Sequence, residues 1–433
     1  MIYIALGSNL GNRLTNLRRA VAVIKDEILL QSTESIVIET EALMTAGAPQ
    51  EWNKPYLNMV IAGKSAIKPA EMMLRLQDIE KRLGRDDSAA SWAPRIIDLD
   101  ILMYNDKVID EPELSVPHKE LLNRPFLVHL LALLPERFIP YLQINGNKMR
   151  ANEYAHKNFD CNNLFSKSFV LGPQIAAVLN ITPDSFSDGG VNFDHEIAVQ
   201  NAYKMVQDGA EIIDIGAQST RPGGIEVIGP DKEYERLVHV LEGLKNLDAK
   251  ISIDTYHPKL IRKLLQKYKI DWVNDVTGNL DDDTLKEIAT AGCKIVTMHS
   301  FSIPPTKERV LSHGQKASTQ MRVWGEMMLW RMQKHGFSVD EVIIDPGIGF
   351  GKSIYQNLSI LRGVQQLRIG GAKILIGHSR KSFISGFSCA EAIGRDLETV
   401  AISCNLAKSG VDFLRVHNVA DHHRLLVASK ISA

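Results

Sequence analysis

Two domains of different fold class are predicted by the sequence: an α+β ferredoxin-like domain at the N-terminus, joined to an α/β TIM (β/α)8 barrel. In residues 1–145 the strand and helix signals follow the order β-α-β-β-α-β, which is typical of a ferredoxin-like sandwich. Residues 169–433 hold eight β-rich runs separated by helix-length segments, the size of a (β/α)8 barrel. Residues 146–168, rich in Asn and Lys and poor in apolar runs, are expected to be a linker with one short helix.

Apolar periodicity predicts the elements of the first domain. Apolar residues recur every three or four positions in residues 14–28, and again after Pro69, which a first helical turn tolerates. Short apolar runs predict the strands. In chain order the predicted elements are a strand at 2–6, a helix at 14–28, strands at 35–40 and 56–62, a helix at 69–83 and a strand at 96–104.

Eight strands are predicted in the second domain, and nearly all of them end in polar residues. The runs are 175–181, 211–216, 250–254, 272–276, 294–299, 342–345, 373–377 and 413–417. Strands buried on both faces should be apolar throughout, so polar residues gathered at their C-terminal ends indicate the mouth of a barrel, where its active site lies. The polar ends are Asn180, Asp214, Asp254, Asn274, Asp275, His299, Asp345, Ser379, Arg380, Lys381, Arg415 and His417.

Composition excludes several classes of protein. With 50 basic and 51 acidic residues, the chain has no field of one sign that could hold nucleic acid or an anionic membrane. No apolar run approaches the ~18 residues of a membrane span, and residues 1–8 lack the basic region of a signal peptide. The four cysteines show no C-x-x-C spacing, so we expect a cytoplasmic protein with reduced, mostly buried thiols.

The strongest local signal is the pair Asp98 and Asp100. Residues i and i+2 of a strand share a face, which places their Cα atoms about 6.6 Å apart at ~3.3 Å per residue. Two neighbouring carboxylates repel each other, and Mg2+ resolves this conflict with one or two carboxylates and substrate phosphates. On these residues alone, a pair of solvated surface aspartates remains an alternative. His118 and Arg124, which follow in the sequence, can meet phosphate oxygens.

The runs ALGSNLGNR, PYLN, WAPRIIDLDIL and SVPH resemble hydroxymethyldihydropterin pyrophosphokinase over about residues 1–145. The resemblance implies transfer of the terminal pyrophosphoryl group of ATP to the hydroxymethyl oxygen of a pterin, which leaves AMP. It implies two Mg2+ ions at Asp98 and Asp100 and a catalytic set of Asp98, Asp100, Arg95 and His118. It places the pterin at Tyr56, Asn58, Trp92 and Phe126, and ATP at Gln77, Glu80, Arg85, Arg95, Ile101, Ser115, His118 and Arg124. Asp87 and Ser91 depart from the pattern, because many members carry arginines there.

The runs LNITPDSFSDGG, STRPGG, SRKS and RVH, in this order, resemble dihydropteroate synthase over about residues 170–433. The resemblance implies that p-aminobenzoate is joined to the pterin methylene with loss of pyrophosphate, and that sulfonamides target the site. It implies catalytic roles for Asp254, Lys381, Arg415 and His417. The pterin would lie at Asp254, Asn274, Val276, Asp345, Phe350 and Lys381. Pyrophosphate would lie at Asn180, Thr220, Arg221, Arg415 and His417, with Mg2+ near Asn180, and aminobenzoate at Thr220, Pro222, Phe350 and Ser382.

Two features of the second domain depart from that pattern. Gln218 stands where many members have Glu, and the run HSFSIPPTKE after the fifth strand lacks the usual motif. The run 346–353, PGIGFGKS, nearly matches a phosphate-binding P-loop, but Pro346 replaces the first glycine and the run follows a late barrel strand. We therefore interpret residues 350–352 as part of a pterin pocket.

The two resemblances fit together, because the product of the first activity is the substrate of the second. We expect a bifunctional folate enzyme that uses ATP, hydroxymethyldihydropterin and p-aminobenzoate, and a homodimer formed through the barrel. The rival interpretation is a non-catalytic N-terminal module that orders or regulates the synthase. The retained Asp98 and Asp100 argue against it, and Asp87 and Ser91 argue mildly for it. A purely structural scaffold is disfavoured by the polar strand ends.

Overall fold

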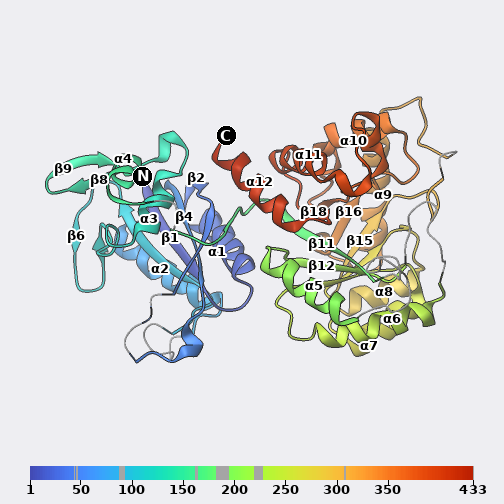
Figure 1. The fold of residues 1–433 in the computed structure, drawn as a ribbon, viewed down its shortest axis with the longest axis horizontal. Coiled ribbons are helices and arrows are strands. Elements are labelled where there is room, and N and C mark those ends of the chain that lie inside the picture. Colours follow the sequence, from blue (N-terminus) through green and yellow to red (C-terminus); the bar gives the residue numbers. More distant parts are fainter. Residues whose placement is uncertain are drawn as a thin grey trace. The chain divides into compact units, whose positions relative to one another are not determined.

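The computed structural model describes residues 1–42, 44, 47–86, 93–160, 164–181, 195–218, 228–306 and 309–432. It contains two compact units, Met1–Leu171 with Leu426–Ala433, and Gly172–Leu425 (Figure 1). Across the described ranges, every helix is too short or too polar to cross a membrane. Among the three cysteines described, Cys293 is buried as expected, whereas Cys404 is half-buried and Cys389 is exposed. The expectation of mostly buried thiols is therefore wrong.

An antiparallel sheet organises the first unit. Its central strand β1 (Ile2–Ser8) pairs with β4 (Tyr56–Lys64) on one side and with β5 (Asp98–Tyr104) on the other. Beyond β4 lies β3 (Val37–Thr40), and β2 (Leu30–Glu34) also pairs with β4. The predicted α+β fold with the order β-α-β-β-α-β is confirmed, except that two short strands replace the single one predicted at 35–40.

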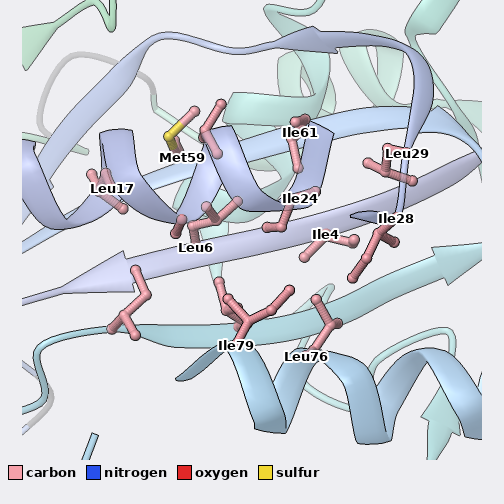
Figure 2. Close-up of a cluster of buried hydrophobic side chains, with 14 of the residues drawn as sticks. Ile4, Leu6, Leu17, Ile24, Ile28, Leu29, Met59, Ile61, Leu76 and Ile79 are labelled. Carbon is pink, nitrogen blue, oxygen red and sulfur yellow. The ribbon is translucent and has the colours of Figure 1, made fainter. Parts of the chain in front are cut away.

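Helices α1 (Arg13–Glu27) and α2 (Pro69–Arg82) contribute to one core with the sheet. Apolar residues every third or fourth position along the helices meet every second residue of the strands, which is why these two periodicities predict the elements. Figure 2 shows side chains of both helices and of β1 and β4 gathered in this core, among them Leu17, Ile24, Leu76, Ile79, Ile4, Leu6, Met59 and Ile61.

Residues 146–168, expected to be a linker, are largely structured where they are described. They contain β9 (Asn147–Arg150), which pairs with β8 (Tyr141–Ile144), and α4 (Ala151–Asn158), which packs against α3 (Pro125–Ala132). Strand β10 (Ser168–Phe169) then pairs with β3. The short helix expected there is α4, whose buried residues are Ala151 and Ala155, whereas strands β9 and β10 were not expected. A boundary at which the two domains can be separated stays a prediction.

The second unit is a closed parallel barrel, as predicted, with one strand for each of the eight runs. The strands are β11 (Gln174–Asn180), β12 (Ile212–Gly216), β13 (Lys250–Asp254), β14 (Trp272–Asp275), β15 (Lys294–Met298), β16 (Val342–Asp345), β17 (Lys373–Ile376) and β18 (Phe413–Val416). Figure 1 shows the helices around them: α5 (His195–Gln207), α6 (Pro230–Gly243), α7 (Pro258–Lys267), α8 (Asp282–Thr290), α9 (Ala317–Lys334), α10 (Ile354–Arg362), α11 (Asp396–Lys408) and α12 (Val419–Ile431).

Apolar side chains fill the barrel interior. Trp272 and Phe413 meet edge to face, with ring centroids 4.7 Å apart, and Ile343 and Leu375 belong to the same cluster. A filled interior leaves the strand ends as the place where polar side chains can meet substrates. The C-terminal ends of the strands are therefore the place for a functional site in the second unit.

Replacing Phe169 by Ala should lower the free energy of unfolding of the first unit by about 3–5 kcal/mol. The side chain is 4% exposed and belongs to the main core, although it lies next to the expected linker. Urea unfolding followed by hydrogen exchange in β3 and β4 measures the change. Val108→Ala, at an exposed position of the same unit, is the matched control. An unchanged midpoint for the Phe169 variant would show that β10 adds nothing to this unit.

Candidate active sites

Three predicted residues of the first unit converge around Gly7. In the sheet register Gly7 of β1 lies opposite Asn58 of β4 and Asp98 of β5. A β-carbon on Gly7 would stand 3.2 Å from Asn58 Oδ1, 3.5 Å from the Tyr56 ring and 3.9 Å from Asp98 Cβ. The missing side chain therefore leaves a small space bordered by an aromatic ring, an amide and a carboxylate. Asn58 also donates to Thr40 Oγ1 at 2.8 Å, which fixes its side chain.

Asp98 is surrounded by arginines. Its Oδ1 accepts a hydrogen bond from Arg95 at 2.6 Å and one from Arg85 at 3.2 Å. About a quarter of each of these three side chains is exposed, so the cluster can be reached from solvent. Two guanidinium groups beside one carboxylate form an environment that suits a phosphate chain.

Glu80 lies behind the aspartate pair. Its carboxylate accepts the backbone N–H of Leu99, between Asp98 and Asp100, at 2.7 Å and pairs with Arg85 at 2.5 Å. Burial raises the pKa of Glu80 to about 7, which Arg85 opposes. The side chain is 3% exposed, so its contacts describe a support beneath the aspartates rather than the predicted contact with ATP.

Asp100 carries the electrostatic strain expected of paired carboxylates. Burial and the charge of Asp98 raise the pKa of Asp100, whereas His118, Arg124 and Arg95 act to lower it. A divalent cation relieves this strain. Among the residues described, no cluster of three or more His, Cys, Asp or Glu side chains forms a metal site. Two carboxylates are nevertheless what Mg2+ takes from a protein when substrate phosphates complete its shell.

Some of the remaining predicted residues of this unit lie near Asp100, and others do not. His118 and Arg124 influence Asp100, and the partly buried Phe126 and Ser115 lie in α3 and in the short strand β7 (Ser115–Val116). Gln77 is exposed on α2. The Ile101 side chain is buried in the core, so only its main chain remains for contact with ATP. Trp92, Asp87 and Ser91 lie outside the described residues.

One residue that the sequence reasoning did not assign is Asn9. Its Oδ1 accepts the backbone N–H of Arg95 at 2.7 Å, and its Nδ2 donates to Lys54 O at 3.3 Å. Asn9 is 4% exposed and so ties the end of β1 to the segments that carry Arg95 and Tyr56. A polar residue directly after a buried strand was the available signal.

At the mouth of the barrel, Arg415 lies between two carboxylates. Its Nε donates to Asp214 Oδ2 at 2.5 Å and its NH2 group donates to Asp254 Oδ2 at 2.7 Å. Asp214 also accepts from Ser252 Oγ at 2.6 Å and from Asn274 Nδ2 at 3.1 Å. Asp214 was recognised only as a polar strand end, yet it is the centre of this network. The resemblance implied a catalytic role for Arg415 and contact with pyrophosphate, and the structure adds its ion pairs with Asp214 and Asp254.

The charges in this network shift one another's pKa values. Burial raises the pKa of Asp254 to about 7; Arg415 opposes the rise and Asp214 adds to it. The two carboxylates raise the pKa of Arg415, which therefore stays charged. A β-carbon on Gly216 would lie 3.5 Å from Asp254 Cβ and 3.8 Å from Asn180 Oδ1, so Asn180 borders the same space.

Asp345, Phe350 and Lys381 form the other side of the mouth. Lys381 Nζ lies 4.5 Å from the centre of the Phe350 ring and donates to Ile348 O. Burial lowers the pKa of Lys381 to about 8, and Asp345 acts against this change. Burial raises the pKa of Asp345, which Lys381 opposes. The two groups thus favour each other's charged form.

Other predicted residues of the barrel lie around this centre. His417 Nδ1 is 2.9 Å from Ser379 Oγ, which ties the ends of β17 and β18 together. Asn274 lies in β14 and Val276 directly follows that strand, and both are buried, whereas Ser382 is exposed. Thr220, Arg221 and Pro222 lie outside the described residues.

The chain is similar to known proteins over both units. A family model described as 7,8-dihydro-6-hydroxymethylpterin-pyrophosphokinase matches residues 3–135, and one described as a pterin binding enzyme matches residues 176–417. A folate synthesis bifunctional protein of Chlamydia caviae is 37% identical over 436 residues, which cover 99% of this chain and 97% of that protein.

Two solved dihydropteroate synthases are similar in fold. The one from Anaplasma phagocytophilum, with bound 6-hydroxymethylpterin-monophosphate, has a TM-score of 0.54 at 30% identity and covers 60% of this chain and 100% of that one. The one from Thermus thermophilus, in complex with 4-aminobenzoate, has a TM-score of 0.53 at 30% identity and covers 61% and 96%. With its two matching domains, this chain belongs to the family of bifunctional folate synthesis proteins and carries a hydroxymethyldihydropterin pyrophosphokinase followed by a dihydropteroate synthase.

Proposed function

We propose that the two sites described above act in turn on one pterin. The first transfers pyrophosphate from ATP to 6-hydroxymethyl-7,8-dihydropterin and releases AMP. The second condenses the product with p-aminobenzoate to give 7,8-dihydropteroate and pyrophosphate. The observation that carries the proposal is the pair Asp98 and Asp100 beside Arg85 and Arg95, because this is a set of groups that can receive a polyphosphate and its metal.

In the first site the pterin would lie next to Asp98 and would be held by Tyr56, Asn58, Trp92 and Phe126. Mg2+ bound at Asp98 and Asp100 would neutralise the triphosphate and orient it. Arg95 and Arg85, now paired with Asp98, would turn to phosphate oxygens, while Gln77, Ser115, His118, Arg124 and the main chain of Ile101 would complete the ATP side. Pyrophosphoryl transfer needs mainly positioning and neutralisation of charge, and these residues supply both.

Asp98→Asn should lower AMP formation by about 10²-fold or more, because it removes half of the carboxylate pair. Dihydropteroate formation from supplied pterin pyrophosphate should stay near that of the unchanged chain. AMP release from ATP and hydroxymethyldihydropterin is the measurement, and Asp110→Asn, at an exposed position of the same unit, is the matched control. Near-normal AMP release by the Asp98 variant would contradict the proposed role of Asp98 and Asp100 in pyrophosphoryl transfer. No AMP release by the unchanged chain would favour the non-catalytic module instead.

In the second site, Asp254, Asn274 and Asp345 would accept and donate hydrogen bonds at the aminopyrimidine edge of the pterin, with Val276, Phe350 and Lys381 beside its rings. The pyrophosphate would be bound by Thr220, Arg221, Arg415, His417 and Asn180, with Mg2+ near Asn180. Aminobenzoate would lie near Thr220, Pro222, Phe350 and Ser382. The aryl amine is already neutral at pH 7, so departure of pyrophosphate is the harder step. The cationic groups would stabilise charge on the leaving group, and the carboxylates would stabilise the electron-poor pterin left behind.

If pyrophosphate leaves the pterin before the amine attacks, the pyrophosphate site should be formed before aminobenzoate binds. Aminobenzoate, or a sulfonamide that mimics it, should bind at least about tenfold more tightly with pyrophosphate and Mg2+ present than without them, a coupling of ordinary size. Calorimetric titration of the whole chain in both conditions measures this. Equal affinities would count heavily against the proposed order.

We also propose that the chain forms a homodimer through the barrel. Several apolar side chains are exposed on that unit, among them Tyr355 on α10, Phe387, Ile393 and Leu397 on α11, and such groups are common in interfaces. Light scattering should give about twice the 48.2 kDa of the chain, and Leu397→Glu should give the single-chain mass. A single-chain mass for the unchanged protein would refute the dimer.

A further inference from the structure

Lys352, which the sequence predicted to be part of the pterin pocket with residues 350 and 351, has a buried side chain to which the proposed function gives no separate role. It is the next-to-last residue of the P-loop-like run 346–353 between β16 and α10, and it is 8% exposed. Its Nζ lies 2.8 Å from Phe350 O, 2.9 Å from His299 Nδ1 and 3.3 Å from His299 O. Burial lowers the pKa of Lys352 to about 7, which Asp345 opposes. In its ammonium form the side chain has three donors and no acceptor, so these three groups then use its whole hydrogen-bonding capacity. The amine is therefore not directed at a phosphate, unlike the lysine of a P-loop.

The contact constrains the tautomer of His299. Burial, and after it Lys352, lowers the pKa of His299 to about 3, so the ring is neutral. Towards the ammonium form of Lys352, which cannot accept, Nδ1 is the acceptor and the proton lies on Nε2. The ring is held edge to face against Phe301 and Trp324, with centroids 4.9 and 5.2 Å away. His299 is thus a rigid acceptor at the end of β15.

The loop 346–352 is packed against that strand end at more than this one point. Gly347 has φ +64°, and a β-carbon there would lie 2.0 Å from His299 O, a distance that only glycine allows. Farther along, Gln356 Nε2 donates to Leu311 O at 2.7 Å, and Asn357 donates to Lys352 O at 3.2 Å. The loop after β15, which departs from the family's pattern, therefore acts as the support for the loop after β16.

The supported loop carries Phe350, and Lys381 lies against it. Lys352 holds the Phe350 carbonyl, Lys381 holds the neighbouring Ile348 carbonyl, and the Lys381 ammonium lies over the Phe350 ring. From this geometry we infer that Lys352 is a positioning residue for the synthase: its bond to His299 fixes the loop that presents Phe350 and Lys381 to the pterin. Phe350 and Lys381 face the pterin only under the proposed function, on which the inference rests.

The test compares the pterin affinity and the kinetics of three single variants and one control variant. Lys352→Met keeps the length of the side chain and removes the donors, and His299→Leu removes the acceptor. Each should raise the KM for the pterin pyrophosphate and the Kd for 6-hydroxymethylpterin about tenfold, with a smaller change in kcat, because the loop shifts in the ground state. His299→Asn restores an acceptor and should recover most of the affinity. Lys286→Met, at an exposed position of the barrel, should leave both constants unchanged.

The double variant Lys352→Met/His299→Leu should be no worse than either single variant, because the two residues act as one pair. Unchanged pterin affinity in Lys352→Met and His299→Leu, with only a lower melting temperature, would overturn the positioning role. If Lys352→Met does not fold, the contrast between His299→Leu and His299→Asn decides the question. Lys381→Met tests the proposed function separately. If Lys381→Met loses pterin affinity and Lys352→Met does not, the positioning role of Lys352 is refuted and the proposed pterin site stands. If neither variant loses pterin affinity, the assignment of the pterin site is refuted.

Discussion

The ion pairs of Arg415 with Asp214 and Asp254 hold the barrel mouth in its observed arrangement. Two carboxylates from β12 and β13 share one guanidinium from β18, at 2.5 and 2.7 Å. Removing one partner of such a buried pair leaves an uncompensated charge and costs about 3–5 kcal/mol. Ser252 and Asn274 satisfy further lone pairs of Asp214. Asp254, which we propose receives the pterin, and Arg415, which we propose receives pyrophosphate, are therefore parts of one charge balance. A change in one of the two residues should alter the electrostatic environment of the other.

The same physical arrangement recurs in the first unit on a different fold. Asp98 is neutralised by Arg95 and Arg85 until a substrate arrives, and Glu80 supports the strand from behind. In both units arginine side chains pair with the aspartates of the site. A phosphate that enters exchanges one ionic partner for another, which costs less than desolvating a free charge. Such an exchange would let a chain with a net charge of −1 bind polyphosphates at local clusters of arginine and aspartate.

The sequence predicted features that depend on periodicity or on position within a repeat. The eight barrel strands were found because each is an apolar run that ends in a polar residue, and Asp98 with Asp100 because i and i+2 share a strand face. Contacts between distant residues could not be predicted in this way. Side-chain directions fixed by the fold decide three such contacts. They are the hydrogen bond between Asn9 and Arg95, the one between Glu80 and Leu99, and the two ion pairs that Arg415 makes with Asp214 and Asp254. Strands β9 and β10 were missed because each is very short and lies in a segment rich in Asn and Lys.

Proton release on pterin binding tests most directly whether Asp254, balanced by Arg415, is the carboxylate that receives the pterin. Burial raises the pKa of Asp254 to about 7, so the free site is mostly protonated at pH 6 and mostly ionised at pH 8. Binding to the carboxylate form should release a larger fraction of a proton at pH 6 than at pH 8. Titration of 6-hydroxymethylpterin in buffers of different ionisation enthalpy measures this release. Equal release at both pH values, or proton uptake at pH 6, would contradict the assignment.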